Sequence, residues 1–153
     1  MQIRKAIMND TEYIYELIKM YSSQGTLLPR TRLSIYEKLQ CFHVAVEGND
    51  IVGVVSLHIL DYDLAEVRSL VVHPKHTSKG IGYKLVHSVI EETRKLGVNR
   101  LISLTYEIDF FHKCGFEIVR MATLPQKMWK DCINCPKLNS CDETAMLINA
   151  SYV

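Results

Sequence analysis

A polar loop that is rich in lysine and glycine joins two apolar segments in the middle of the chain. Val71 and Val72 end a β-branched run, residues 73–80 are mostly polar, and apolar residues recur at helical spacing from Ile81. A loop between a strand and a helix presents free backbone N–H groups at the positive end of the helix dipole. Gly80 and Gly82 let the backbone approach a ligand closely, and the segment carries three lysines, Lys75, Lys79 and Lys84. The stretch therefore predicts an anion site of the size of a phosphate group.

Three cysteines near the C-terminus form a second group that could do chemistry. Cys132 and Cys135 have the Cys-x-x-Cys spacing of half a zinc site, and Cys141 adds a third thiol. Three thiolates do not complete a structural zinc site, and a fourth ligand would have to come from elsewhere in the chain. The same spacing also suits a redox-active pair, or thiols that only pack in a loop. All three interpretations remain open.

Strand and helix patterns in a definite order must position these groups. The sequence predicts strands over residues 3–6, 41–47, 51–59, 65–72, 101–105 and 116–119, with 145–148 able to close the sheet. It predicts a first helix that starts at residues 9–11, with Asp10 or Thr11 able to cap it. Further helices are expected over about 33–39, 81–96 and 109–114. In the first helix, Ile14, Leu17, Ile18 and Tyr21 recur at helical spacing and should face the core. Gly97 is the expected end of the third helix.

Composition indicates one ordinary globular domain. The 153 residues are 48% hydrophobic and 23% charged, with a formal net charge of +1. This near-neutral balance gives no support to a nucleic-acid partner. We see no signal peptide and no apolar span of membrane length, so we expect a cytoplasmic protein without a membrane partner.

The loop and a later segment together resemble the GNAT superfamily of N-acetyltransferases. Residues 71–82 resemble its acyl-CoA pyrophosphate loop, a hydrophobic strand and x-Pro before Arg/Gln-x-x-Gly-x-Gly/Ala, although Thr77 replaces the Arg/Gln. Residues 110–116 resemble the segment beside the acyl-CoA tail, with Phe111 at the place of the usual tyrosine acid. The resemblance implies an α+β GNAT fold, with a mixed, mostly antiparallel sheet of six to seven strands flanked by about four helices. It also implies one domain over residues 1–153, with a cysteine-containing C-terminal segment at 127–143.

This resemblance assigns roles to individual residues. It implies acetyl-CoA binding by Val71, Val72, Thr77, Ser78, Lys79, Gly80, Ile81, Gly82, Lys84 and Phe111. The Val72 N–H would polarise the thioester carbonyl. Glu66 would be the base or hold a water that is, unless it is only an exposed strand residue paired with Arg68. Tyr106 is the nearest alternative proton donor by sequence, or a packing tyrosine. Cys114 lies near the expected acyl-CoA tail, so a covalent route stays open beside direct attack by the amine.

Residues 24–30 and 65–74 resemble the acetyltransferase domain of bacterial N-acetylglutamate synthases. That resemblance places Leu28 and Arg30 in the substrate pocket, where a guanidinium can make a planar two-point contact with a carboxylate. Arg68 is a plausible second cation. The synthases end in a Tyr-Asn-x-Gln-Arg-type stretch, whereas this chain has the cysteine-containing segment there, with Lys127 or Lys130 as possible replacements.

The sequence thus predicts an N-acetyltransferase that moves acetyl from acetyl-CoA to the primary amine of a small carboxylate-bearing metabolite, glutamate or another amino acid. One alternative is protein or peptide N-acetylation. Another is a non-catalytic acyl-CoA-binding sensor that uses the cysteine cluster. We expect a monomer or homodimer.

Overall fold

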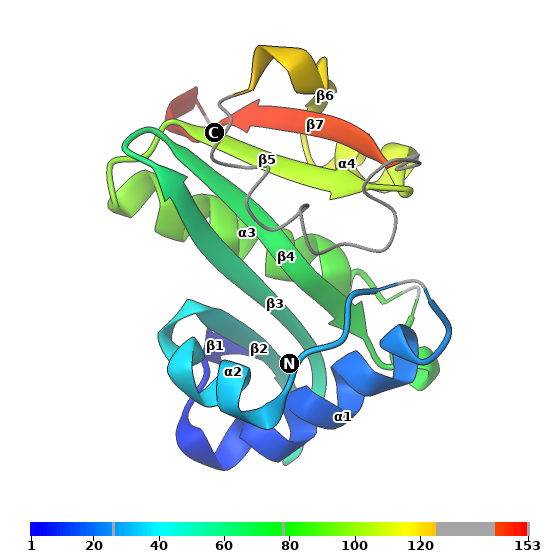
Figure 1. The fold of residues 1–153 in the computed structure, drawn as a ribbon. Coiled ribbons are helices and arrows are strands. Elements are labelled where there is room, and N and C mark those ends of the chain that lie inside the picture. The colour runs from blue at the N-terminus through cyan, green and yellow to red at the C-terminus, as the bar shows by residue number, and fades with distance from the viewer. Residues whose placement is uncertain (26, 78, 125–142, 153) are drawn as a thin grey trace. The chain divides into compact units, whose positions relative to one another are not determined.

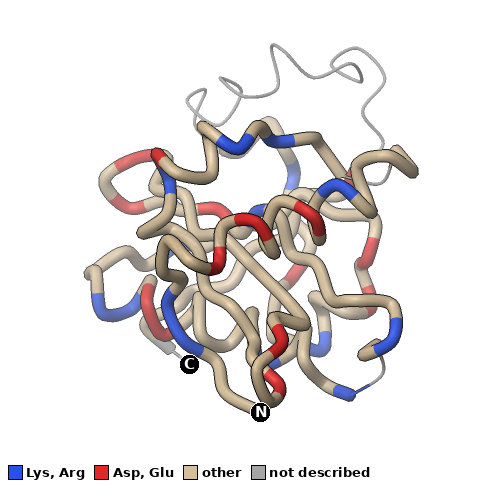
Figure 2. The backbone as a smooth tube through the Cα atoms, turned by 90° about the horizontal axis from the view of Figure 1, so that it is seen from below, with Lys and Arg blue, Asp and Glu red and all other residues tan. Residues whose placement is uncertain are grey.

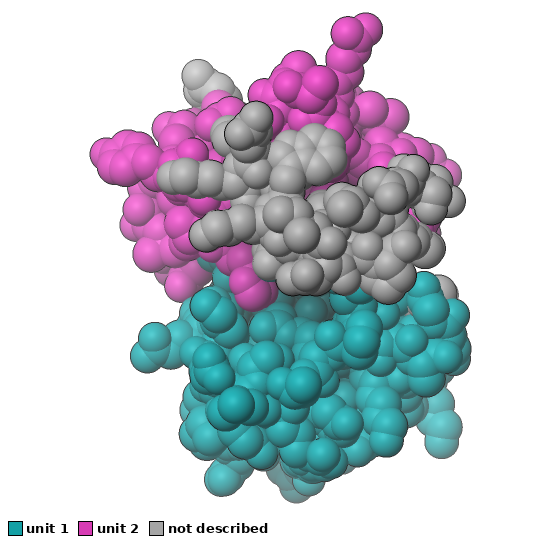
Figure 3. Space-filling view, in the orientation of Figure 1, with its two compact units in different colours: residues 1–57, 68–89 teal, residues 58–67, 90–153 magenta. Residues whose placement is uncertain are grey.

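The computed structural model describes residues 1–25, 27–77, 79–124 and 143–152 (Figure 1). The chain forms two compact units (Figure 3). Unit 1 comprises residues 1–57 and 68–89, and unit 2 comprises residues 58–67 and 90–153. The chain passes from one unit to the other within single elements, since residues 57 and 58 both belong to strand β3 and residues 67 and 68 both belong to strand β4.

Seven strands hydrogen-bond in the order β1-β2-β3-β4-β5-β7-β6. Their bounds are β1 Gln2–Lys5, β2 Phe42–Glu47, β3 Asp50–Asp61, β4 Leu64–Val72, β5 Arg100–Thr105, β6 Glu117–Ile118 and β7 Thr144–Asn149. Strands β4 and β5 run parallel, while the pairs β1–β2, β2–β3, β5–β7 and β6–β7 run antiparallel. The predicted mixed, mostly antiparallel sheet is confirmed.

Four α-helices are found in the described part of the chain. They are α1 Thr11–Ser22, α2 Arg32–Glu37, α3 Ile81–Lys95 and α4 Ile108–Lys113. None of these helices is long and apolar enough to span a membrane. Basic and acidic residues are interspersed along the described chain, as Figure 2 shows, in agreement with the near-zero net charge.

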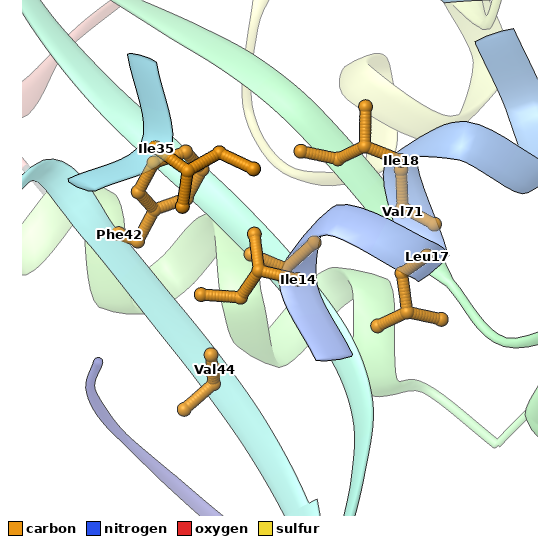
Figure 4. Close-up of a cluster of buried hydrophobic side chains, with 8 residues drawn as sticks. Ile14, Leu17, Ile18, Ile35, Phe42, Val44 and Val71 are labelled. Atoms are coloured by element: carbon orange, nitrogen blue, oxygen red, sulfur yellow. The ribbon is translucent and has the colours of Figure 1, made fainter. Parts of the chain in front are cut away.

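The core of unit 1 joins α1 and α2 to β2 and β4. Figure 4 shows Ile14, Leu17 and Ile18 of α1 beside Ile35, Phe42, Val44 and Val71, and each of these side chains is at most 4% exposed. The three α1 residues recur at i, i+3 and i+4, the spacing that places side chains on one helix face. Tyr21 packs against the same cluster while partly exposed. The predicted inward face of α1 is therefore confirmed.

The start of α1 differs from the prediction. The Asp10 carboxylate forms no cap on α1; it accepts the Ile7 N–H at 2.8 Å and pairs with Arg4 at 2.7 Å. The Thr11 hydroxyl donates to the Met8 carbonyl at 2.8 Å. A 3-10 turn over Met8–Asp10 precedes the helix, so these side chains close that turn instead. Burial alone would raise the pKa of Asp10, but its bonds to Arg4 and the Ile7 N–H outweigh burial and lower it.

The core of unit 2 is formed by residues of β4, β5 and β7 together with Leu124. Leu64, Ile102, Leu124 and Ala145 form a buried cluster. The β4–β5 ladder pairs Leu64 with Arg100, Ala65 with Leu101 and Glu66 with Ile102. This part of β4 is thus a regular inner strand, buried throughout from Leu64 to Val67.

Candidate active site

The predicted phosphate loop follows β4 directly, and several hydrogen bonds hold its backbone. The His73 N–H donates to the Val52 carbonyl of β3 at 2.8 Å. His73 then caps the 3-10 turn Pro74–His76, because its Nδ1 accepts the Lys75 N–H at 3.1 Å. The Thr77 hydroxyl donates to the Pro74 carbonyl at 3.2 Å. Thr77, which replaces the expected Arg or Gln, therefore supports the loop from within.

The loop ends at the N-terminus of α3 in the way that the sequence predicts. The Lys84 N–H makes the first helical bond, to the Gly80 carbonyl at 3.1 Å, so the N–H groups of Ile81 and Gly82 precede the helical ladder. Gly80 has φ +76, a conformation that L side chains rarely adopt, although a Cβ there would meet nothing within 4 Å. The glycine is therefore needed for its backbone conformation and not for lack of space.

Two lysines stand on either side of these N–H groups in the sequence. The side chains of Lys79 and Lys84 are exposed, and the Lys79 ammonium lies 3.3 Å from His76 Nδ1. Ser78 lies outside the described residues. The loop thus combines a helix N-terminus with positive charge, the arrangement that binds phosphate groups.

Gly53 of β3 allows α3 to lie close to the sheet. A Cβ at this position would come within 2.9 Å of Leu85, 3.2 Å of Ile81 and 3.3 Å of the Val71 carbonyl. A larger residue at position 53 would force the Leu85 and Ile81 side chains of α3 to shift. Gly53 therefore helps to fix the helix N-terminus relative to the end of β4.

The second half of β4, which leads into the loop, departs from regular strand geometry. Ser69 has φ +53, the one positive φ at a non-glycine residue in the described part of the chain. The buried Ser56 hydroxyl of β3 donates to the Arg68 carbonyl at 2.9 Å, immediately before Ser69. Backbone in such sparsely populated conformations costs about 1–3 kcal/mol and concentrates at functional sites. Val72 ends this stretch of β4 and Val71 beside it is buried in the core of unit 1.

The predicted substrate residues lie on the loop between α1 and α2. Leu27 packs against the core of unit 1, which leaves the next residue, Leu28, 53% exposed. The Arg30 guanidinium lies over the Phe42 ring, with its carbon 5.0 Å from the ring centroid. Phe42 and Val71 belong to one core cluster, so the same packing supports both Arg30 and the end of β4. Arg68, the predicted second cation, is half-buried on β4.

Arg32 anchors the far end of the substrate loop, a role that the sequence analysis missed. Its guanidinium donates two hydrogen bonds to Glu12, at 2.8 and 3.0 Å, and lies 4.0 Å from the Tyr15 ring centroid. These bonds raise the pKa of Arg32. Thr31 beside it caps α2 by accepting the Ser34 N–H at 3.0 Å. A spacing of twenty residues between Glu12 and Arg32 gave no local signal for this pair.

The predicted catalytic residues belong to unit 2. Glu66 is 6% exposed, which disagrees with the alternative of an exposed strand glutamate. A buried carboxyl group is sensitive to its neighbours, as a general base must be. Tyr106 follows β5 and is 43% exposed. Phe111 is buried, and its ring meets those of Phe110 and Phe116 edge-on at 5.1 and 5.2 Å.

Cys114 is a poor candidate for a covalent intermediate. Its side chain is 4% exposed, and burial raises the pKa of the thiol to about 11. Because the thiolate is the nucleophilic form, such a thiol is almost entirely inactive near neutral pH. This favours direct attack by the amine.

The proposed zinc ligands Cys132, Cys135 and Cys141 lie outside the described residues, as does most of the segment 127–143. Elsewhere, in the parts of the chain that the structure describes, no group of three or more His, Cys, Asp or Glu side chains could hold a metal ion.

A family model decides which class of protein carries this site. The model of the acetyltransferase (GNAT) family matches residues 9–116. The chain belongs to the GNAT acetyltransferase family. It is an acetyl-CoA-dependent N-acetyltransferase of GNAT type, related to amino-acid acetyltransferases.

Curated relatives of this GNAT domain come from several bacteria. An uncharacterized N-acetyltransferase of Chlorobaculum tepidum is 34% identical over 95% of this chain and 94% of its own length. An amino-acid acetyltransferase of Mycobacterium tuberculosis is 34% identical over 74% of this chain and 67% of its own length. The amino-acid acetyltransferase of Salmonella typhi is 30% identical over 84% of this chain, which spans only 30% of that longer protein.

Solved structures give the same picture of the GNAT fold. A Mycobacterium tuberculosis protein in complex with CoA has a TM-score of 0.84 at 27% identity, covering 97% of this chain and 99% of the other. The N-acetylglutamate synthase of Neisseria gonorrhoeae, in complex with coenzyme A and N-acetyl-glutamate, has a TM-score of 0.88 at 25% identity. That match covers 97% of this chain and 35% of the synthase.

Proposed function

We propose that this GNAT domain acetylates the primary amine of a small metabolite that carries a carboxylate, with glutamate or another amino acid as acceptor. The observation that carries the proposal is Arg30, on the loop between α1 and α2, whose guanidinium carbon lies over the Phe42 ring, 5.0 Å from the ring centroid. A guanidinium supported by an aromatic face is suited in shape and charge to a planar two-point contact with a carboxylate. The named amino-acid acetyltransferases among the relatives agree with this acceptor class.

In the proposed reaction, acetyl-CoA lies with its pyrophosphate on the loop at residues 73–82. The acyl chain runs along the end of β4, where the Val72 N–H polarises the thioester carbonyl as negative charge develops on its oxygen. The residues that hold the cofactor are those of the sequence prediction: Val71, Val72, Thr77, Ser78, Lys79, Gly80, Ile81, Gly82, Lys84 and Phe111.

The acceptor enters as an ammonium ion and must lose a proton before it attacks. Glu66 takes that proton, directly or through a water, because its buried carboxylate is the acidic group on the strand that leads to the loop. The neutral amine then attacks the thioester carbon, the C–S bond breaks, and coenzyme A leaves as a thiolate. Tyr106 donates its proton to that thiolate, and the proton that the new amide nitrogen loses restores the Tyr106 hydroxyl. Arg30 and Arg68 bind carboxylate groups of the acceptor, and Leu28 lines its apolar part.

The test measures thiol release from acetyl-CoA against free amino acids, polyamines and short peptides, first with the wild type and then with Arg30→Gln. A charge-assisted bond to a carboxylate contributes about 1.5–3 kcal/mol, so Arg30→Gln should raise the KM of the best amino acid by about tenfold to hundredfold. The Arg30→Lys variant keeps the positive charge but loses the planar guanidinium, so its KM should lie between those of the wild type and Arg30→Gln.

Arg94→Gln is the matched control, since Arg94 pairs with Glu91 on the surface of α3 at 2.6 Å and should leave the KM unchanged. The proposal would be contradicted if a polyamine or a peptide were the best acceptor and Arg30→Gln left its KM unchanged. Binding of acetyl-CoA without turnover of any amine would favour the sensor.

A further inference from the structure

Tyr21 of α1 reaches the end of β4 and binds it through a hydrogen bond. Its hydroxyl donates to the Val72 carbonyl at 2.7 Å, across 51 positions of the sequence. Both partners belong to unit 1. The ring of Tyr21 packs against the core formed by Ile14, Leu17 and Ile18, so the helix holds the hydroxyl in place.

The bond to Tyr21 identifies the edge of β4 towards which Val72 points. In a strand, the N–H and C=O of one residue point to the same edge, and neighbouring residues alternate. The His73 N–H points towards β3, where it donates to the Val52 carbonyl at 2.8 Å. The carbonyl and the N–H of Val72 therefore both point away from β3, to the edge where the Tyr21 hydroxyl lies. The β4–β5 ladder occupies this edge over Leu64–Glu66, and Val72 lies beyond it.

The peptide between Val72 and His73 is consequently held on both sides. Tyr21 holds its carbonyl and Val52 holds its N–H. Further back along β4, the Ser56 hydroxyl holds the Arg68 carbonyl next to the left-handed Ser69. A segment with an irregular backbone keeps one geometry only when its surroundings impose it, and the two hydroxyl groups supply that constraint.

We propose that Tyr21 is a positioning residue, which holds Val72 so that its N–H stays directed at the thioester carbonyl of acetyl-CoA. The inference rests on the proposed function for the role of the Val72 N–H. Hydrogen-bond catalysis of this kind depends on donors that are fixed before charge develops. The sequence placed Tyr21 on the core face of α1 and gave no function to its hydroxyl.

The experiment compares wild type, Tyr21→Phe and Tyr13→Phe by isotope-edited infrared spectroscopy of acetyl-CoA labelled with carbon-13 at the thioester carbonyl. Tyr13 is the matched control, because it lies on the same helix and is 58% exposed. Binding to wild type and to Tyr13→Phe should shift the carbonyl band to lower frequency. Tyr21→Phe should bind with a smaller shift, and its kcat should fall by about threefold to tenfold with a lesser change in the KM for acetyl-CoA.

The melting temperature separates positioning from a structural role. If Tyr21→Phe melts earlier but binds acetyl-CoA with the wild-type carbonyl shift and kcat, the inference is wrong. An absence of any shift in the wild type would overturn it as well. The infrared comparison needs no acceptor, so it still decides the role of Tyr21 if no amine is acetylated. In that case the proposed function fails and the inference is tested separately.

Discussion

The two halves of strand β4 differ in structure and in what they contribute. Residues Leu64–Val67 are all buried and begin the parallel ladder with β5. Residues Arg68–Val72 are mostly half-buried, include the left-handed Ser69, and are held by hydroxyl groups from β3 and α1. The boundary between the two units falls between Val67 and Arg68, where this change occurs.

This difference shows how one strand can serve both stability and binding. The first half satisfies its backbone through the ladder, so its side chains are free to fill the core of unit 2. In the second half, the Ser56 and Tyr21 hydroxyl groups also bond to the backbone, at the Arg68 and Val72 carbonyls. We infer that substitutions in the first half chiefly change stability, and those in the second half chiefly change binding and rate.

The largest effect on stability is expected from Leu64→Ala in the first half of β4. Leu64 is fully buried in the cluster of unit 2, so the cavity and lost contacts should lower the free energy of unfolding by about 2–5 kcal/mol. Urea denaturation measures this change. Ile59→Ala in β3 is the control, because Ile59 is 55% exposed and its loss should matter by less than about 0.5 kcal/mol. A loss below about 1 kcal/mol for Leu64→Ala would contradict the inference that the first half of β4 chiefly contributes stability.

A smaller effect is expected on the reactivity of the Cys114 thiol. An acyl-cysteine intermediate at Cys114 would place the reaction at α4 and not at the second half of β4. With a pKa of about 11, its thiolate fraction at pH 8 is about one hundredth of that of an ordinary cysteine. Alkylation by iodoacetamide, followed by mass spectrometry, should be at least about hundredfold slower in the folded than in the urea-unfolded protein. The rate should rise with pH up to about 11. Rapid alkylation at pH 8 would contradict the prediction and would support an acyl-cysteine intermediate at Cys114.

The smallest effect is expected at Ser69, where backbone conformation can be tested apart from side-chain contacts. A β-branched residue tolerates φ +53 poorly, so Ser69→Val should lower the free energy of unfolding by about 1–3 kcal/mol and weaken acetyl-CoA binding. Ser69→Gly is the matched variant, and should be neutral or stabilise the protein by up to about 1 kcal/mol. Thermal melting and calorimetric titration with acetyl-CoA measure both effects. Equal behaviour of the two variants would show that the left-handed conformation at residue 69 has no role.

Much of the fold could be predicted because the signals are local. The spacing of Ile14, Leu17 and Ile18 predicts the buried face of α1, and the sequence of apolar run, polar loop and Gly80 predicts β4, the loop and the start of α3. The predicted ends of helices and strands differ from the observed ends by one or two residues in most cases, because capping and strand pairing decide where an element ends. The prediction that Asp10 could cap α1 is wrong, since its carboxylate bonds to Arg4 and to the Ile7 N–H.

The site was predictable in part. The strand, loop and helix of residues 64–95 follow one another as the motif predicts, and Arg30 lies over an aromatic ring. The burial of Glu66 and the contact of Arg32 with Glu12 could not be predicted, because each depends on neighbours that are distant in sequence. The roles given to Glu66, Tyr106 and Arg68 remain predictions.

The sequence by itself determined the family, the order of elements and the position of the loop between β4 and α3, since these depend on periodicity, glycine placement and the motif at residues 71–82. Only the tertiary structure decided how the end of β4 is held. The Tyr21 hydroxyl meets Val72 because residues of α1 pack in one core cluster with Val71 at the end of β4. A hydrogen bond needs its two atoms within about 3 Å, and no local pattern in a chain fixes a distance between residues 51 positions apart.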